Sequence, residues 1–167
     1  VNNSENVIYV AVDFNHQSLK EQLLTSGYDP NKPAIFTLEG VSQYISKEAL
    51  VSTLEELSEL TQNKSAIFFM SYVDKQLKEN PKACFGKGYV NPEKKSEMVQ
   101  KMSAKVGEPW ISFYTSEEIA DILSNNGFKI SENKTLEDLN EAYFTPVERT
   151  IPENEIFNLE HFVVAKK

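Results

Sequence analysis

The fold is decided by residues 34–73, which read AIFTLEGVSQYISKEALVSTLEELSELTQNKSAIFFMSYV. Two apolar runs of strand length stand at its ends, from Ala34 to Leu38 and from Ser65 to Val73. Between them, leucines recur at helical spacing from Ser46 to about Asn63, with glutamates on the opposite side. A strand, a helix and a strand in this order predict parallel strands joined by a right-handed crossover, the unit of an α/β fold.

The same alternation extends upstream of this unit. The segment Val7 to Val12 (VIYVAV) is a continuous apolar run, the pattern of a strand buried on both faces. Ser18 with Glu21 then fits a capping box at the start of a helix, and Gly27 suits the left-handed position after its end. We therefore predict one more strand followed by one more helix.

Downstream, Thr115 with Glu118 forms another capping box, and Gly127 ends the helix that begins there. A strand is predicted from Phe128, and the last strand from Phe157 to Ala165. The connection between them suits a hairpin-like return, which makes the final strands antiparallel at the edge of the sheet. The predicted fold is thus α/β, with a mostly parallel sheet and an antiparallel edge strand.

Residues 75–110 do not follow this alternation. They are rich in Lys and Glu and contain several prolines and glycines, and only residues 91–106 (NPEKKSEMVQKMSAKV) suggest a helix. We interpret the segment as a lid or insertion. With 167 residues, the chain has room for one compact domain.

Composition limits the environment and the partners. A net charge of −8 and a pI near 4.9 argue against nucleic acid, whose binding depends on clustered Lys and Arg. The single cysteine, Cys84, excludes an intrachain disulfide and fits a reducing, cytoplasmic location. No apolar run reaches the roughly 20 residues of a membrane span, and the start lacks the pattern of a secretory signal. Because the sequence begins at Val1 without an initiator Met, we expect that something precedes it.

Acidic residues follow three of the apolar runs directly. Asp13 with Phe14, Glu39 with Gly40, and Asp74 stand where the strands end. Ligands of open parallel sheets bind outside the carboxyl ends of the strands, where carboxylates can accept charge-assisted hydrogen bonds. Acidic residues also cap turns and helices, so a structural role for them stays open at this point.

Other kinds of site have weaker support. His16 and His161 lie too far apart in the sequence for the spacing of known metal pairs. Ser42 and Ser71 lie outside any G-x-S-x-G nucleophile elbow, and no phosphate-binding glycine loop is present. These observations disfavour a metalloenzyme, a serine hydrolase and a kinase.

Four segments together carry a family resemblance. They read VAVDF (residues 10–14), LLTSGYDPNKPAIFTLEGVSQYI (23–45), SAIFFMSYVD (65–74) and GEPWISFYTSEEIADILSNNGF (107–128). In this order they resemble the later half of the leucine carboxyl methyltransferase-like family. The resemblance implies a Rossmann-like methyltransferase fold, S-adenosyl-L-methionine as cofactor, and methyl transfer to an oxygen or carboxylate of a small molecule or peptide.

The resemblance also implies residue roles. Asp13 matches the acidic residue that accepts a hydrogen bond from the adenine amine, and Phe14 matches its neighbour at the ring edge. Glu39, followed by Gly40, matches the glutamate near the methionine moiety and the reacting centre. Tyr44 is a candidate for the acceptor pocket, although a core tyrosine is an equally good interpretation.

The chain also departs from the family pattern. The N-terminal half, with the first strand, its glycine-rich turn and the ribose-binding acid, is absent, so residues 1–167 match one partial domain. We expect the missing half in cis or in trans, and we expect the isolated chain to be inactive. Residues 41–45 (VSQYI) are more polar than is usual after the glutamate. The alternative function is a non-catalytic binding or interaction domain on a degenerate methyltransferase scaffold.

Overall fold

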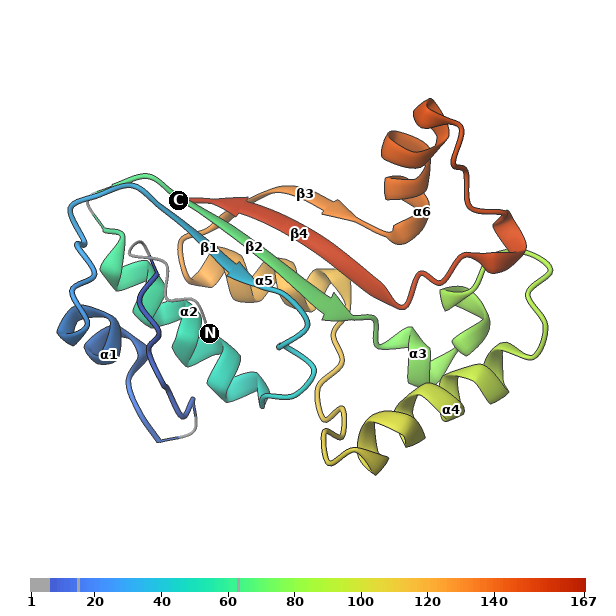
Figure 1. Cartoon of the computed structure of the whole chain (residues 1–167), viewed down its shortest axis with the longest axis horizontal. Coiled ribbons are helices and arrows are strands. Elements are labelled where there is room, and N and C mark those ends of the chain that lie inside the picture. Colours follow the sequence, from blue (N-terminus) through green and yellow to red (C-terminus); the bar gives the residue numbers. More distant parts are fainter. Residues whose placement is uncertain (1–6, 15, 63) are drawn as a thin grey trace.

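A single four-stranded sheet organises the protein (Figure 1). The computed structural model describes residues 7–14, 16–62 and 64–167. The strands lie in the order β1-β2-β4-β3, with β1 parallel to β2 and β4 antiparallel to both of its neighbours. Their bounds are Ala34–Leu38 (β1), Ala66–Val73 (β2), Lys129–Lys134 (β3) and Glu160–Lys166 (β4).

Helices and short helical turns fill the connections between the strands. The helices are α1 (Leu19–Thr25), α2 (Lys47–Leu60), α3 (Gln76–Glu79), α4 (Pro92–Lys105), α5 (Ser116–Asn125) and α6 (Leu136–Leu139). The shorter turns are η1 (Pro81–Cys84), η2 (Asn140–Phe144), η3 (Thr145–Val147) and η4 (Glu153–Glu155).

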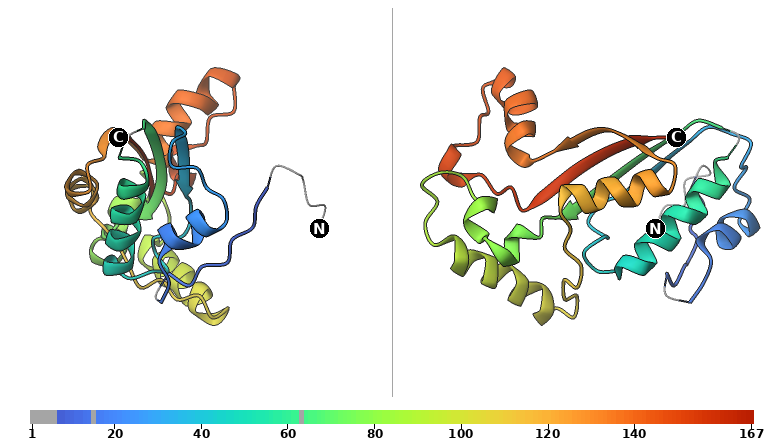
Figure 2. Two further views of the ribbon diagram at one scale, coloured as in Figure 1. Left: turned by 90° about the vertical axis from the view of Figure 1, so that its left-hand side faces the viewer. Right: turned by 180° about the vertical axis from the view of Figure 1, so that it is seen from behind.

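The main core lies between one face of the sheet and the helices α2 and α5, which cover that face (Figure 2). Leu50 and Leu54 of α2 are completely buried, as are Ile119 and Leu123 of α5. They pack with the alternate residues of β2 that point to the same side, and the stripe of leucines predicted for residues 46–63 is therefore confirmed as a core face.

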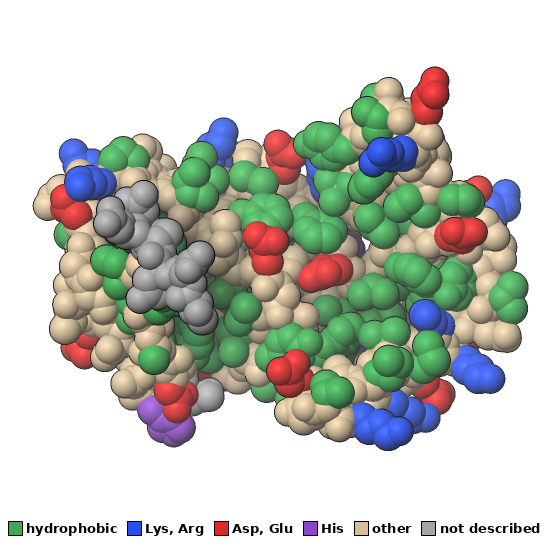
Figure 3. Space-filling model, viewed as in Figure 1, with side chains coloured by type: hydrophobic (Ala, Val, Ile, Leu, Met, Phe, Trp, Pro, Cys, Tyr) green, Lys and Arg blue, Asp and Glu red, His purple; other side chains and the backbone are tan. Residues whose placement is uncertain are grey.

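The opposite face of the sheet carries exposed apolar side chains. Ile35 of β1 and Ile67 of β2 are register partners and are 71% and 39% exposed. Figure 3 shows hydrophobic side chains gathered over this face. β1 is also the end strand of the sheet, so its outer edge has no strand partner among the described residues.

The α/β class and the mixed sheet agree with the prediction. The position of the antiparallel strand differs in detail, because β4 lies one place in from the edge and β3 takes the edge itself. A strand that enters between two others must pair on both sides, and its pairing partners are distant in sequence, so local pattern does not reveal its place.

The strand predicted for residues 7–12 is wrong. This segment is extended but is not part of the sheet, and Val7, Ile8 and Tyr9 are 49%, 69% and 72% exposed. Figures 1 and 2 show it running clear of the strands. An apolar run becomes a buried strand only where neighbouring strands accept its backbone, and the described residues supply none.

The helix α1 begins as predicted, although its cap is shared with α2. Ser18 Oγ accepts from the backbone N–H of Glu21 at 3.2 Å and donates to Glu56 Oε2 at 3.1 Å. Glu56 also accepts from the backbone N–H of Lys20 at 2.6 Å. Of the predicted capping box only the bond from the Glu21 N–H to Ser18 is present, and a carboxylate from α2 binds the first turn of α1 and ties the two helices together.

Residues 75–110 form α3, η1 and α4, which confirms the helix predicted within 91–106. Leu77 and Cys84 are buried in a second, smaller apolar cluster at the end of β2. Ser96 Oγ of α4 donates to the carbonyl of Leu77 at 2.7 Å and so fixes α4 to α3. The part of the chain that the structure describes contains no helix long and apolar enough to cross a bilayer.

Candidate functional site

The carboxyl end of β1 is fixed by hydrogen bonds to β2. Gly40 has a left-handed φ of 64° and donates its backbone N–H to Ser71 Oγ at 2.9 Å. Ser42 Oγ donates to the Ser71 carbonyl at 2.8 Å, and both serines are buried. Ser42 and Ser71 thus hold the loop after Glu39 in place, which agrees with the absence of a nucleophile motif around them.

The loop that precedes α5, which contains Ile111 and Ser112, is hydrogen-bonded to the loop after β1. The backbone N–H groups of Ile111 and Ser112 both donate to the carbonyl of Gln43, at 2.8 and 3.2 Å. Ser112 Oγ donates to the carbonyl of Ile45 at 2.6 Å. The backbone carbonyls of Gln43 and Ile45 in this way join the loop after β1 to a segment almost 70 residues later in the chain.

A groove with a volume of about 610 Å³ lies between these two loops. Its rim also carries a side-chain hydrogen bond, in which Trp110 Nε1 donates to the Tyr44 hydroxyl oxygen at 3.1 Å. Two of the predicted site residues, Gly40 and Tyr44, are therefore brought together. The lining residues are Gly40, Tyr44, Gly107, Glu108, Pro109 and Ile111.

Asp13 lies on the segment outside the sheet and is held by its own neighbours. Its Oδ2 is 2.8 Å from Nδ1 of His16, and its backbone N–H donates to Gln17 Oε1 at 2.8 Å. The backbone N–H groups of His16 and Gln17 both donate to the Asp13 carbonyl. Phe14 beside it is half-buried. The structure thus shows Asp13 in a turn, the structural role that the sequence left open beside the ligand role.

Asp74, the third acid at a strand end, is paired inside the protein. Its Oδ2 lies 3.0 Å from His161 Nε2, and its Oδ1 accepts from the backbone N–H of Gln76 at 2.8 Å. Burial pushes the pKa of Asp74 up, but the hydrogen bonds from His161 and Gln76 outweigh burial and hold this pKa below its ordinary value. Asp74 therefore fastens the end of β2 to β4.

Sequence reasoning missed several residues in the groove and next to it. Glu108, which lines the groove, and Trp110, at its rim, belong to the sequence GEPW, and no local pattern pairs them with Tyr44. Gln43 belongs to the polar sequence VSQYI, which gives no sign of a side chain that lacks a hydrogen-bond partner. It is 5% exposed, and its side-chain Oε1 has no hydrogen-bond partner among the described residues.

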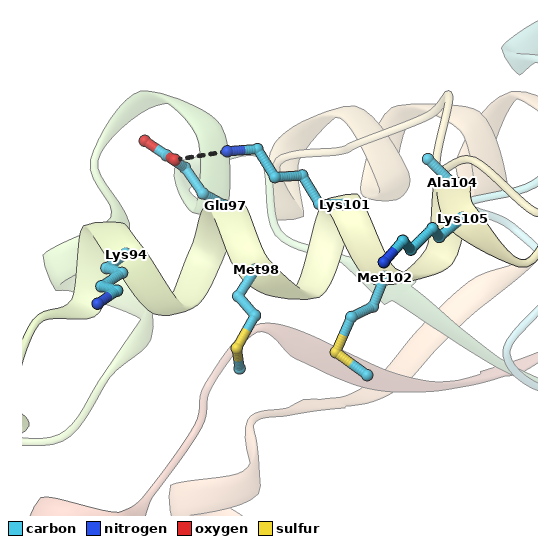
Figure 4. A pocket seen from close by; sticks show the side chains of 7 residues that line it. All are labelled: Lys94, Glu97, Met98, Lys101, Met102, Ala104 and Lys105. Carbon is cyan, nitrogen blue, oxygen red and sulfur yellow. Dashed lines mark hydrogen bonds and ion pairs between the residues drawn. The ribbon is translucent and has the colours of Figure 1, made fainter.

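A larger hollow, of about 730 Å³, runs along α4 and contains none of the predicted site residues. Figure 4 shows Met98 and Met102 pointing to one side of the helix, away from Glu97 and Lys101. Met98 is 43% exposed and Met102 61%. One helix lines this hollow alone, whereas the groove is lined by two loops that lie far apart in the sequence, so the groove is the better candidate site.

The residues after β1 leave room for a small molecule beside the backbone. Glu39 is exposed, and a Cβ added to Gly40 would meet nothing within 4 Å, so the backbone there faces open space. The groove volume lies in the usual range of small-molecule sites. Asp13 fits less directly, because its carboxylate is shared with His16.

Comparison with known proteins agrees with the family resemblance. Residues 1–58 match the family described as leucine carboxyl methyltransferase, and this region contains every predicted site residue. Over 137 residues the chain is 31% identical to the Bacillus subtilis (strain 168) protein named "Putative S-adenosyl-L-methionine-dependent methyltransferase YktD". The match covers 82% of this chain and 41% of that protein, so the chain spans less than half the length of this relative.

Solved structures confirm the fold class. A DUF574 family protein from Streptomyces avermitilis MA-4680 superposes with a TM-score of 0.63 at 15% identity, over 95% of this chain and 54% of that one. Mycolic acid cyclopropane synthase CmaA1, solved with SAH and CTAB, gives a TM-score of 0.52 at 10% identity, over 84% and 56%. At these identities the likeness concerns the fold alone.

Proposed function

We propose that this chain belongs to the leucine carboxyl methyltransferase family and is the C-terminal portion of an S-adenosylmethionine-dependent methyltransferase. Its acceptor is an oxygen or a carboxylate of a small molecule or peptide. The observation that carries the proposal is the groove at the carboxyl end of β1, where Gly40 and Tyr44 meet the second loop.

Glu39 and Gly40 would hold the methionine side of S-adenosyl-L-methionine, which supplies a methyl group on a sulfonium when bound. The carboxylate of Glu39 would stabilise positive charge there. Asp13 would accept from the adenine amine, with Phe14 at the ring edge, once the carboxylate turns from His16. Tyr44 would contact the acceptor from the groove wall.

The principal task of these residues is alignment. In-line displacement depends on a near-attack arrangement of donor and acceptor and on exclusion of water. The paired bonds at Ser71 and Gln43 keep both loops of the groove in fixed positions. The segment 75–110, whose end contributes Gly107, Glu108 and Pro109 to the groove, would act as a lid over it.

The rest of the cofactor site would come from an N-terminal half, in cis or in trans. That half would add strands at the outer edge of β1 and cover Ile35 and Ile67 on the open face of the sheet. Its strands would also give residues 7–12 a partner. Without it we expect no normal binding of S-adenosyl-L-methionine and no activity.

Calorimetric titration with S-adenosyl-L-methionine tests the proposal, using the chain alone and the complete protein with its upstream half. We expect binding in the complete protein only. Asp13→Ala and Glu39→Ala should each weaken it by about 1.5 to 3 kcal/mol, the typical value of a hydrogen bond to a charged group. Glu55→Ala, which removes an exposed carboxylate from α2, is the matched control and should leave affinity unchanged.

The outcomes separate the two functions. If the complete protein takes up no cofactor, the enzyme proposal fails, and the non-catalytic binding domain on a degenerate scaffold becomes the better account. If it binds but Asp13→Ala and Glu39→Ala behave like the Glu55→Ala control, the two carboxylates are structural turn residues and the site assignment is wrong.

A further inference from the structure

One side of α4 holds the helix against the protein, and another side is largely open. Ser96 is 2% exposed, and its Oγ donates to the carbonyl of Leu77. At 3.6 residues per turn, Met98 lies roughly 200° round the helix from Ser96, and Met102 stands about one turn beyond Met98 on the same side. The two methionines are 43% and 61% exposed and line the hollow of about 730 Å³ (Figure 4). An apolar pair therefore faces away from the contact that anchors α4.

Lysines stand at both ends of this methionine pair. Lys94 precedes Met98 by four residues and Lys105 follows Met102 by three, spacings that place side chains next to each other on a helix. Both lysines line the hollow, and neither forms an ion pair with a carboxylate of the described residues. Lys101, the third lysine of the hollow, is paired within α4. The hollow thus combines an apolar centre with positive charge at each end.

The charge of this region is opposite to that of the chain as a whole. Residues 75–105 contain eight lysines and three glutamates, a net charge of +5 in a chain whose net charge is −8. Complementary charge across an interface steers the correct partner and repels partners of like charge, so a surface that docks here is acidic. Flexible methionine side chains adapt to apolar groups of different shapes. The hollow therefore favours an acidic partner that also carries apolar side chains.

The shape of the hollow favours a helix over a small molecule or a membrane. Small-molecule sites enclose most of the ligand, whereas α4 alone lines this hollow. Lys94 and Lys105 are separated by about 16 Å along the helix axis, which corresponds to about three turns of a partner helix. Helices that lie in a membrane surface carry larger apolar residues such as Trp, Phe and Leu, and the apolar lining here consists of Met98, Met102 and Ala104.

We propose that the face of α4 formed by Lys94, Met98, Met102 and Lys105 binds an acidic amphipathic helix of a partner protein. Two apolar side chains of the partner, one turn apart, pack on the methionines, and carboxylates beside them pair with the two lysines. This is the helix-in-groove mode of recognition. The contact involves neither the cofactor nor the methyl acceptor, so it goes beyond the proposed function.

Methionine methyl groups report on this face directly in an NMR titration. The chain has three methionines, and the third, Met70, is completely buried in the core. We would titrate the chain alone and the complete protein with a synthetic helical peptide of about 16 residues that carries two leucines one turn apart and glutamates beside them. The Met98 and Met102 signals should shift to saturation while the Met70 signal stays in place. The same peptide with lysines in place of the glutamates should shift none of them.

The apolar part of the contact is tested by a double substitution. Met98→Ser combined with Met102→Ser should weaken binding of the glutamate peptide about tenfold or more, because two partly exposed side chains no longer gain from burial. Fluorescence anisotropy of the labelled peptide measures the affinity. Val147→Ser removes an apolar side chain that is 60% exposed outside this face, and this control should leave the affinity unchanged.

The charged part is tested by single substitutions. Lys94→Gln and Lys105→Gln should each weaken the glutamate peptide about two- to threefold, the effect of an exposed ion pair, and added salt should reduce the difference. Lys129→Gln removes an exposed lysine from β3 and is the matched control, with unchanged affinity expected.

The proposal is overturned if the lysine peptide binds as well as the glutamate peptide, or if neither shifts the Met98 and Met102 signals. Binding to the chain alone but not to the complete protein would also overturn it, because the upstream half would then cover α4. Two other results would assign the face to a different occupant and so refute the proposal. Signals that move on dilution of the protein without peptide would indicate a second copy, and a response to phosphatidylglycerol vesicles but not to the glutamate peptide would indicate a membrane.

Discussion

The pair formed by Asp74 and His161 should set the stability of the sheet end next to the groove. Their side chains are each 13% exposed, and Nε2 lies 3.0 Å from Oδ2. The imidazole also stacks on Tyr72 with ring centroids 5.0 Å apart. His161→Phe keeps an aromatic ring against Tyr72 and removes only the hydrogen-bond donor, so it isolates the bond from the packing.

The expected loss follows from the nature of the bond. A hydrogen bond to a charged group contributes about 1.5 to 3 kcal/mol, and the remaining solvent contact of both side chains favours the lower end. We therefore expect His161→Phe to lower the free energy of unfolding by about 1.5 kcal/mol at pH 7. Urea unfolding followed by circular dichroism measures it as a lower midpoint with an unchanged m-value.

The same pair predicts a pH dependence. Because the pKa of Asp74 is lowered in the folded protein, its contribution to stability is complete above the unfolded pKa of about 3.9 and is lost as pH falls through the lower folded pKa. Asp74→Asn should flatten the fall of stability below about pH 4. Asp121→Asn, an exposed acid on α5, should keep the original slope.

Two results would refute this reasoning. One is that His161→Phe unfolds at the same urea concentration as the unaltered chain. The other is an Asp74→Asn chain whose stability falls with acid as steeply as that of Asp121→Asn. Either would mean that the bond between Asp74 and His161 is matched by an equally good bond to water after unfolding.

Two further predictions concern the second cluster. A Cβ on Gly86 would overlap the backbone carbonyl of Glu153, so Gly86→Ala should lower the free energy of unfolding by about 2 kcal/mol or more, measured as a lower melting temperature. The control is Gly107→Ala, where the added Cβ meets open space and only the strain of the left-handed backbone remains. Burial raises the pKa of Cys84 to about 12. The thiol of the folded protein should therefore react with Ellman's reagent at pH 8 far more slowly than the thiol of the urea-unfolded chain. Equal rates would show that the apolar cluster around Cys84 opens readily.

The elements that the sequence predicts well are those whose signals are local. Ser46 and Thr115 cap α2 and α5 with side-chain bonds to residues three positions on, and both helices begin where these residues place them. The strand prediction for residues 7–12 is wrong because a strand depends on contacts that are not local. Its composition fits a strand, but a strand also needs neighbours, and the order of the sheet shows that β1 already stands at the end.

The residues of the candidate site differ in the same way: some have local sequence signals and others depend on contacts between distant segments. Gly40 and Tyr44 follow a strand that the sequence identifies, so their place at one end of the sheet was predictable, and the groove contains both. Glu108 and Trp110 reach that groove only because the carbonyl of Gln43 accepts two N–H groups from a distant loop. Every residue type has a backbone carbonyl, so the sequence does not indicate which carbonyl will accept these hydrogen bonds. This part of the site could therefore be found only in the structure.

The contacts around the groove also predict which part of the proposed site the isolated chain can form. The bonds that shape the groove run between β1, β2 and the loop before α5, all within these residues, so the groove should persist without an upstream half. Asp13 lies in a turn, where its backbone N–H donates to Gln17 and its carboxylate lies beside His16. If the proposed function holds, the groove that would take the acceptor is therefore built into the fold of this chain, and the upstream half would complete the cofactor side of the site.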